Sequence, residues 1–390
     1  MRDVMICGVG LHPFGRFPDK SFENLGQEAV LAALKDAGDM AWKNVQMAFC
    51  GTMHGGTAAG HRVLARIGLT GIPIVNVETG CASGSSALVL AWQQIAAGFC
   101  DTAIVIGVEK MPRGFMRMTS YPRWQVLSGL AINPLEFALR ASRHMAEYGT
   151  TEEQLAMVSV KSHRNGALNP YAMYRKALTL EEVLASKIVC HPLRVLEFAA
   201  PGEGAGAVVL STREVARKHT DKPIKVAAAC MGVAKYGTSR VAGGIGQMGH
   251  SARIRNTEVV TELSRQAYER SGIGPEDLDV VELQDTDSGS EIILYEQLGL
   301  CKPGEGGRLV DEGATALGGR IPVNPGGGIL SCSEPTGASA LRQIAEITWQ
   351  LRGEAGARQV RSPRTGLAQA SGAGGNCTVT ILQSENPVSA

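Results

Sequence analysis

The segment around Cys81 carries the strongest chemical signal in the chain. It reads NVETGCASGSSA over residues 76–87, so the cysteine follows a predicted strand, lies in a turn of small residues and opens a predicted helix. A thiol at the N-terminal end of a helix meets free backbone N–H groups and the positive end of the helix dipole, which favour a thiolate. The pattern predicts a nucleophilic cysteine. From these residues alone, a buried cysteine that only packs beside a tight turn is an equal alternative.

The other cysteines do not form a metal-binding pattern. The chain has 9 cysteines, and no two are closer than 19 residues, as between Cys81 and Cys100. This spacing excludes C-x-x-C and zinc-finger arrangements, so no metal site is expected. An odd number of cysteines without a recognisable signal peptide favours free thiols in a reducing cytoplasm.

Composition narrows the classes of partner. The chain has 38 basic and 37 acidic residues, a net charge of +1, and no basic block. A broad phosphate-binding face is therefore not expected, and neither is nucleic-acid binding. Apolar runs fall well short of the roughly 18 residues that cross a bilayer, so no membrane association is predicted.

Strand-like runs alternate with helical patterns along the chain, which is typical of an α/β fold. The order of elements near residues 76–98 returns in NPGGGILSCSEPTGASALRQIAEITWQLRG at 324–353. We interpret this repeat as an internal duplication, with an N-terminal half at 1–225 and a C-terminal half at 226–390. The stretch from about 112 to 190 has no counterpart in the second half, so we predict an inserted loop domain over the site.

The motifs together resemble one family. CASGSSA at 81–87, IVIGVEKM at 104–111, GGRIPVNPGGG at 318–328 and GAGGNCTVTIL at 372–382 resemble thiolases of the sterol-carrier-protein-X type, in the same order and over nearly the whole chain. The resemblance implies a five-layered α/β/α/β/α fold and a homodimer or dimer of dimers. It also implies an acyl-accepting Cys81 and coenzyme A as co-substrate, with no permanently bound cofactor.

Several positions depart from the family pattern. Where related thiolases carry a histidine in an H-D-C-F type segment, this chain has Gln284, and where they carry G-H-P it has Ser333-Glu334-Pro335. The usual second cysteine is replaced by Thr286 in one of its two positions. Cys332, two residues before Glu334, is a candidate replacement for that acid/base cysteine.

These replacements retain plausible chemistry. A carboxylate cannot form the thiolate–imidazolium pair and would raise the thiol pKa, so Glu334 is expected to act as a general base with a raised pKa of its own. Gln284 cannot titrate, but its amide can donate a hydrogen bond to an enolate oxygen. By the resemblance, an oxyanion hole is expected from the Cys81 N–H and the loop that holds Gly372 and Gly374.

His144 lies where relatives often keep a histidine near the substrate. Its functional and structural interpretations are equally weighted.

The predicted function is cleavage or formation of a 3-oxoacyl-CoA through an acyl-Cys81 intermediate. The variant residues suggest an unusual acyl group, such as an aromatic, dicarboxylic or steroid-like one. The alternatives are a retro-aldolase that acts on a 3-hydroxyacyl-CoA and a non-catalytic scaffold subunit. Since thiolases of this branch pair with a small zinc-ribbon, OB-fold protein, such a separate partner is also expected.

Overall fold

A computed structural model of the chain describes residues 1–114, 123–235 and 258–385. Its main sheet is mixed and has nine strands in the order β3-β2-β4-β7-β1-β8-β11-β10-β9. The strands are β1 (Val4–Gly15), β2 (Met47–Gly51), β3 (Ile74–Val77), β4 (Thr102–Lys110), β7 (Glu203–Thr212), β8 (Ile224–Val233), β9 (Val280–Glu282), β10 (Thr365–Gly372) and β11 (Asn376–Ser384).

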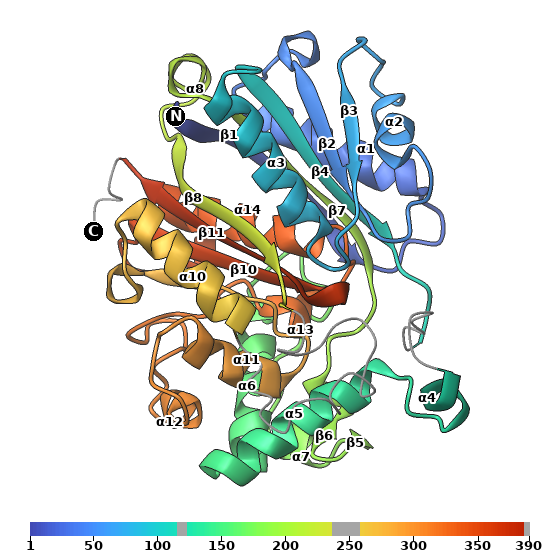
Figure 1. Ribbon diagram of the computed structural model, residues 1–390, viewed down its shortest axis with the longest axis vertical. Coiled ribbons are helices and arrows are strands. Elements are labelled where there is room, and N and C mark those ends of the chain that lie inside the picture. The colour runs from blue at the N-terminus through green and yellow to red at the C-terminus, as the bar shows by residue number, and fades with distance from the viewer. Residues whose placement is uncertain (115–122, 236–257, 386–390) are drawn as a thin grey trace.

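The sheet consists of two sets of strands with a narrow junction. The five strands from β3 to β1 belong to the first part of the chain and the four from β8 to β9 to the second, and Figure 1 shows the first set above the second. Among the described strands, the two sets pair with each other where Met5 and Ile6 of β1 meet Lys225 and Ile224 of β8. The division of the chain at residue 225 stays a prediction. The strand-like segment IPVN at 321–324 is not a strand of the sheet and forms an isolated bridge between Val323 and Val281.

Helices cover both strand sets and fill the space between them (Figure 1). The longer ones are α1 (Phe22–Asp36), α3 (Ser83–Ala97), α5 (Asn133–Tyr148), α6 (Glu152–Ala167), α10 (Glu258–Ser271), α11 (Ser288–Gln297) and α14 (Ser339–Arg352). The shorter ones are α2 (Ala59–Leu64), α4 (Arg123–Leu127), α7 (Leu180–Leu184), α8 (Arg213–His219), α12 (Gly306–Asp311) and α13 (Gly328–Cys332). Helices α3 and α14 touch each other and strands of both sets, while α1 packs on the first set and α10 on the second. This arrangement confirms the predicted layered α/β fold.

The inserted segment packs on the second half of the chain. Its helices α5 and α6 contact α11, and α6 also contacts α12 and α13. Its last residues form β5 (Ile188–Cys190), which pairs in a small hairpin with the following strand β6 (Leu193–Arg194). Residues 115–122 of the predicted insertion lie outside the described residues.

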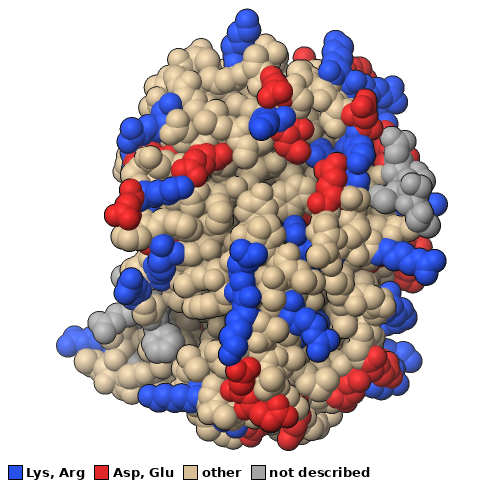
Figure 2. Space-filling model, turned by 180° about the vertical axis from the view of Figure 1, so that it is seen from behind, with Lys and Arg blue, Asp and Glu red and all other residues tan. Residues whose placement is uncertain are grey.

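Surface charge and helix length are the features that bear on nucleic-acid and membrane binding. On the face in Figure 2, basic side chains lie among acidic ones. Within 1–114, 123–235 and 258–385, no helix combines the length and apolarity needed to cross a membrane. The same residues contain no group of three potential metal ligands.

Helix α14 is buried although it carries polar side chains, and ion pairs inside the protein hold two of its charged ones, Arg342 and Glu346. Nη2 of Arg342 donates to Oε2 of Glu282 at 2.8 Å, and Nε of Arg358 donates to both oxygens of Glu346 at 2.9 Å. Arg342 and Glu282 are 1% and 0% exposed. The ion pair therefore fixes α14 against the end of β9.

We expect Arg342→Met to lower the free energy of unfolding by about 3–5 kcal/mol, because it leaves Glu282 buried without its cation. The double variant Arg342→Met/Glu282→Met removes both charges and should lose clearly less. Urea denaturation of the three proteins measures the difference. A double variant less stable than Arg342→Met would contradict the ion-pair account.

Candidate active site

Cys81 lies in a tight turn between β3 and α3. Gly80 has a φ of 64°, and the helix begins two residues after the cysteine at Ser83. The Ser83 hydroxyl donates to the carbonyl of Gly80 at 2.5 Å and accepts the N–H of Thr79 at 2.9 Å. The small polar residues after Cys81 thus hold the turn together. The cysteine itself is 8% exposed.

The glycine-rich turn after β10 packs directly on the Cys81 turn. A Cβ atom on Gly372 would lie 1.9 Å from the carbonyl oxygen of Thr79, and one on Gly80 would lie 2.3 Å from the amide nitrogen of Ala373. Gly374 in the same turn has a φ of 83°. Glycine is therefore required by close approach in both segments. The structure brings Gly372 and Gly374 to the nucleophile turn, and their part in an oxyanion hole stays a prediction.

Gln284 and Glu334 meet at Cys81. Nε2 of Gln284 donates to Oε1 of Glu334 at 2.8 Å, and the thiol of Cys81 hydrogen-bonds both side chains. The backbone N–H of Ser371 donates to Oε1 of Gln284 at 2.9 Å. Since a backbone N–H can only donate, this bond fixes the amide with its nitrogen toward Glu334.

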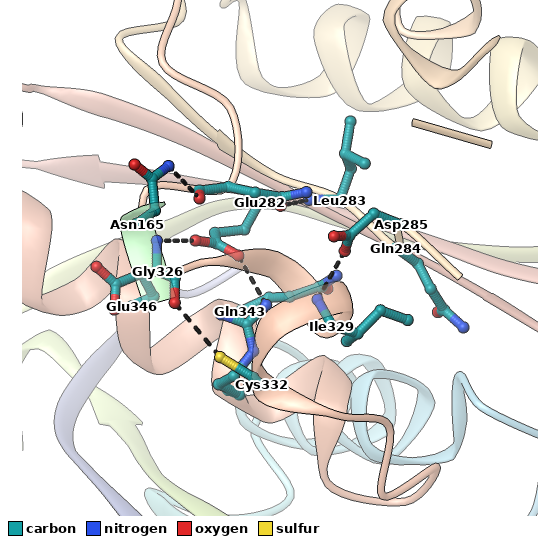
Figure 3. Close-up of polar contacts among 12 residues, drawn as sticks. Asn165, Glu282, Leu283, Gln284, Asp285, Gly326, Ile329, Cys332, Gln343 and Glu346 are labelled. Carbon is teal, nitrogen blue, oxygen red and sulfur yellow. Dashed lines mark hydrogen bonds and ion pairs between the residues drawn. The ribbon is translucent and has the colours of Figure 1, made fainter. Parts of the chain in front are cut away.

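Glu334 is positioned from the backbone. Its N–H donates to the carbonyl of Ala200 at 2.8 Å, in a short parallel bridge between Glu334 and Pro201. Helix α13 directly precedes Glu334 in this region of the chain. The carboxylate of Asp285 caps the start of α13, because it accepts the N–H groups of Ile329 at 2.7 Å and Leu330 at 3.2 Å. Figure 3 shows Asp285 against Ile329, next to Gln284 in the chain. Residues 284–285 therefore supply the Gln284 amide itself and, through Asp285 and α13, help to position the Glu334 carboxylate.

The cluster holds a protonated thiol and a carboxyl that titrates near neutrality. Burial raises the pKa of Cys81 well above its ordinary value, and the charge of Glu334 raises it further. Burial also raises the pKa of Glu334 to about 7, although its hydrogen bonds with Cys81 and Gln284 act to lower it. The helix end does not produce the thiolate that the sequence suggested, because burial and the carboxylate oppose it. The raised pKa expected for Glu334 is present.

Two predicted residues lie elsewhere. Cys332 is buried, and its thiol donates to the carbonyl of Gly326 at 3.3 Å, while Gln284 points away from it (Figure 3). His144 is held between the hydroxyl of Thr150 at 2.8 Å and Oε1 of Glu296 at 3.1 Å. Among these contacts neither side chain reaches Cys81, and the roles of Cys332 and His144 stay predictions.

A cavity of about 360 Å³ opens beside Glu334. Its wall is mostly apolar and comes from the inserted segment, from residues 195–201 and from the second half of the chain. The described lining residues are Met111, Gly114, Asn133, Pro134, Phe137, His163, Tyr174, Val189, Val195, Leu196, Phe198, Ala199, Ala200, Pro201, Thr286, Leu330 and Glu334. Residues from 112–190 thus contribute to the cavity wall, and their interpretation as an insertion stays a prediction.

The sequence analysis did not identify Glu109, which stabilises two segments next to the site by hydrogen bonds. Its buried carboxylate accepts the N–H groups of Met53 at 2.7 Å and His54 at 3.1 Å and the hydroxyl of Thr336 at 2.9 Å. It thereby ties the loop after β2 to the segment that follows Glu334. The available signal was an acidic residue in the apolar run IVIGVEKM.

Ser333 is held in a conformation that suits only glycine. It has a φ of 75° and a ψ of 169°, and its buried hydroxyl has no hydrogen-bond partner. This residue stands where the family pattern G-H-P carries glycine. Backbone strain of this kind costs about 1–3 kcal/mol and concentrates at functional sites.

We expect Ser333→Gly to raise the free energy of unfolding by about 1 kcal/mol, because relief of strain exceeds the entropy that glycine adds to the unfolded chain. Ser331→Gly is the matched control and should destabilise, since Ser331 is helical and its hydroxyl donates to the carbonyl of Tyr174 at 2.9 Å. Chemical denaturation compares the two. A Ser333→Gly protein less stable than the parent would refute the strain.

Comparisons with known proteins agree on one family. A thiolase N-terminal domain model matches residues 4–179, and a thiolase C-terminal domain-like model matches residues 246–385. An acetyl-CoA acetyltransferase of Methanothermobacter thermautotrophicus is 37% identical over 98% of this chain and 100% of its own length. Sterol carrier protein 2 of Bos taurus is 34% identical over 99% of this chain and 73% of its own. The benzoylsuccinyl-CoA thiolase subunit BbsB of Thauera aromatica is 37% identical, with 96% and 95% covered.

Solved structures show the same fold. The chain matches a structure described as an Ltp2-ChsH2(DUF35) aldolase with a TM-score of 0.87 at 24% identity, with 99% of each chain covered. It matches human mitochondrial 3-ketoacyl-CoA thiolase with a TM-score of 0.71 at 16% identity, again over 99% of each chain. With the sequence matches, these findings place the chain in the thiolase superfamily, as an acyltransferase similar to the sterol-carrier-protein type.

Proposed function

We propose that the protein cleaves or forms a 3-oxoacyl-CoA through an acyl-Cys81 intermediate, with Glu334 as the general base and acid. The observation that carries this proposal is the hydrogen-bonded cluster of Cys81, Glu334 and Gln284 at the edge of an apolar cavity. A nucleophile in contact with a base that a third group orients is the usual arrangement for covalent catalysis.

In the cleavage direction, Cys81 gives its proton to Glu334 as the sulfur attacks the 3-oxo carbon of the substrate. The bond between C2 and C3 then breaks, and the leaving enolate takes the proton from Glu334 at C2. Coenzyme A next attacks the acyl-Cys81 thioester. Its thiol proton passes through Glu334 to the Cys81 sulfur, which restores the resting enzyme. A pKa near the working pH suits Glu334 to both directions of transfer.

Gln284 serves this cycle by orientation and as a hydrogen-bond donor. Its amide nitrogen faces the two reacting groups and keeps no charge of its own, so it can donate to an enolate oxygen as Glu334 changes protonation. The Gly372–Gly374 turn and the Cys81 N–H are proposed to hold the thioester oxygen of the acyl-enzyme. The contact of this turn with the Cys81 turn supports that role.

The cavity supports a bulky acyl group. Apolar side chains such as Phe137, Phe198 and Leu330 line it, and the one described charged residue in its wall is Glu334. A second carboxylate beside Glu334 would add like-charge repulsion in a buried site. Among aromatic, steroid-like and dicarboxylic acyl groups, the lining therefore favours the first two.

An assembly is also proposed. β3 is the last strand at one end of the sheet and leaves Val75 exposed, which supports pairing with a second copy of the chain. A small zinc-ribbon, OB-fold partner is also proposed, and two similar proteins support a partner: one is named a thiolase subunit and the other is described as an aldolase with a DUF35 component.

A retro-aldol cleavage is the second candidate, since Glu334 can equally take the proton of a 3-hydroxyl group. This reaction needs no acyl-enzyme. The mass of the intact protein after incubation with 3-oxoacyl-CoA thioesters separates the two functions. We expect an acyl adduct in the parent and in Cys190→Ala, a more exposed thiol, and no adduct in Cys81→Ala.

An absent adduct in the parent, with activity on a 3-hydroxyacyl-CoA, would overturn the thiolase reaction in favour of the lyase. Absence of both activities would favour a scaffold subunit.

We expect the rate of acylation of Cys81 to rise with pH through an apparent pKa of about 7, because Glu334 must be ionised to accept the proton. Glu334→Gln should lower this rate by about 100- to 10,000-fold and abolish the rise. Single-turnover acylation between pH 5 and 9 measures both effects. A rise of the same size in Glu334→Gln would assign the titration to another group.

The same shift predicts a change in stability. The folded protein binds a proton on Glu334 up to about pH 7, whereas the unfolded chain releases it near the ordinary value of 4.5, so stability from this group falls as pH rises across that window. Glu197, whose pKa is also raised to about 7, acts in the same window. The difference in the free energy of unfolding between the parent and Glu334→Gln, measured across this pH range, isolates the contribution of Glu334. A difference that does not vary with pH would contradict the shifted pKa.

A further inference from the structure

His163 is a buried histidine in the cavity wall that the proposed reaction does not use. It lies on α6, is 5% exposed and lines the cavity together with Tyr174 and Glu334. Its ring centre lies 6.2 Å from that of Tyr174. Because buried polar atoms usually have hydrogen-bond partners, each of the two ring nitrogens is expected to have one.

The first nitrogen is satisfied by the protein. Nδ1 lies 3.0 Å from the backbone carbonyl oxygen of Ser159 and 3.4 Å from that residue's hydroxyl. The hydroxyl in turn donates to the carbonyl of Leu196 at 2.5 Å. Because a carbonyl oxygen can only accept, Nδ1 carries the hydrogen. Burial lowers the pKa of His163, so the ring is neutral at pH 7 and Nε2 keeps its lone pair.

In the part of the chain that the structure describes, the second nitrogen has no hydrogen-bond partner. Among the described residues, the hydrogen bonds of the His163 ring all run from Nδ1 to Ser159. Because Nδ1 is turned toward Ser159 and the ring lines the cavity, Nε2 is the nitrogen placed to meet a molecule bound there. An acceptor left unpaired in an apolar wall is unfavourable unless a bound molecule donates to it.

We propose that His163 is a substrate-binding residue whose Nε2 accepts a hydrogen bond from an O–H or N–H group of the thioester held in the cavity. The assignment rests on the proposed function only in taking a CoA thioester as the occupant. Two parts of such a molecule carry the required donor: a hydroxyl on the acyl chain, and the amide N–H groups of the pantetheine arm of coenzyme A.

Two substitutions separate binding from structure. In His163→Asn the amide nitrogen can keep the bond to the Ser159 carbonyl, while the acceptor at the Nε2 position is lost. In His163→Gln the longer side chain can place its oxygen near the Nε2 position. Both are made in the Cys81→Ala protein, so that calorimetry measures dissociation constants without turnover. The probes are coenzyme A, hexanoyl-CoA and hexanoyl-CoA hydroxylated at carbon 4, 5 or 6.

We expect His163→Asn to weaken binding by about 3- to 10-fold, the loss of one neutral hydrogen bond, and His163→Gln to stay within about twofold of the parent. A loss with all the probes assigns the donor to the pantetheine arm. A loss confined to the hydroxylated thioesters assigns it to the acyl chain.

The proposal is overturned if His163→Asn binds every probe as tightly as the parent does. It is also overturned if both variants lose the same affinity together with thermal stability, since that result shows a structural histidine. Failure of the parent protein, which keeps Cys81, to form an acyl-Cys81 adduct would refute the proposed reaction. The dissociation constants measured in the Cys81→Ala background would still decide the role of His163.

Discussion

The hydrogen bond from Gln284 to Glu334 is the contact on which the arrangement of the site depends. It joins the end of β9 to the end of α13, and both side chains reach the Cys81 turn at the start of α3. The Ser371 N–H fixes the amide, and the Asp285 carboxylate fixes the start of α13. Four segments that are far apart in the chain therefore set the distance between one nucleophile and one base.

This arrangement replaces an ion pair by a protonated thiol beside a carboxyl group that titrates near neutrality. A histidine beside a thiol can share its proton as a thiolate–imidazolium pair, whereas Glu334 and a thiolate would repel each other. Burial keeps the proton on Cys81 and raises the pKa of Glu334 to about 7. Attack by sulfur is then coupled to proton transfer instead of relying on a preformed thiolate. The carboxylate has enough basicity for this step only because it is buried.

Close packing between the Cys81 turn and the turn after β10 makes the site possible. Gly80 and Gly372 let the two turns touch at their backbones, and Glu109 ties the loop after β2 to Thr336. The inserted segment crosses from the first half to the second and contributes Phe137 and His163 to the cavity wall. The reacting groups are thus held by main-chain contacts, while the cavity is shaped by side chains of a separate segment.

The sequence by itself determined the layered α/β class, the family and the turn at Cys81. The alternation of strand-like and helical patterns, the order of the motifs and the small residues around Cys81 can all be read directly along the chain. It also named Glu334 and Gln284, since both stand at positions of the family pattern. It could not separate Cys332 from Glu334, two residues apart, and only the tertiary structure turns one toward Gly326 and the other toward Cys81. The same holds for His144 and His163, which lie on neighbouring helices. Burial, partner and direction decide what a thiol, carboxyl or imidazole can do, and those properties arise from contacts between distant segments.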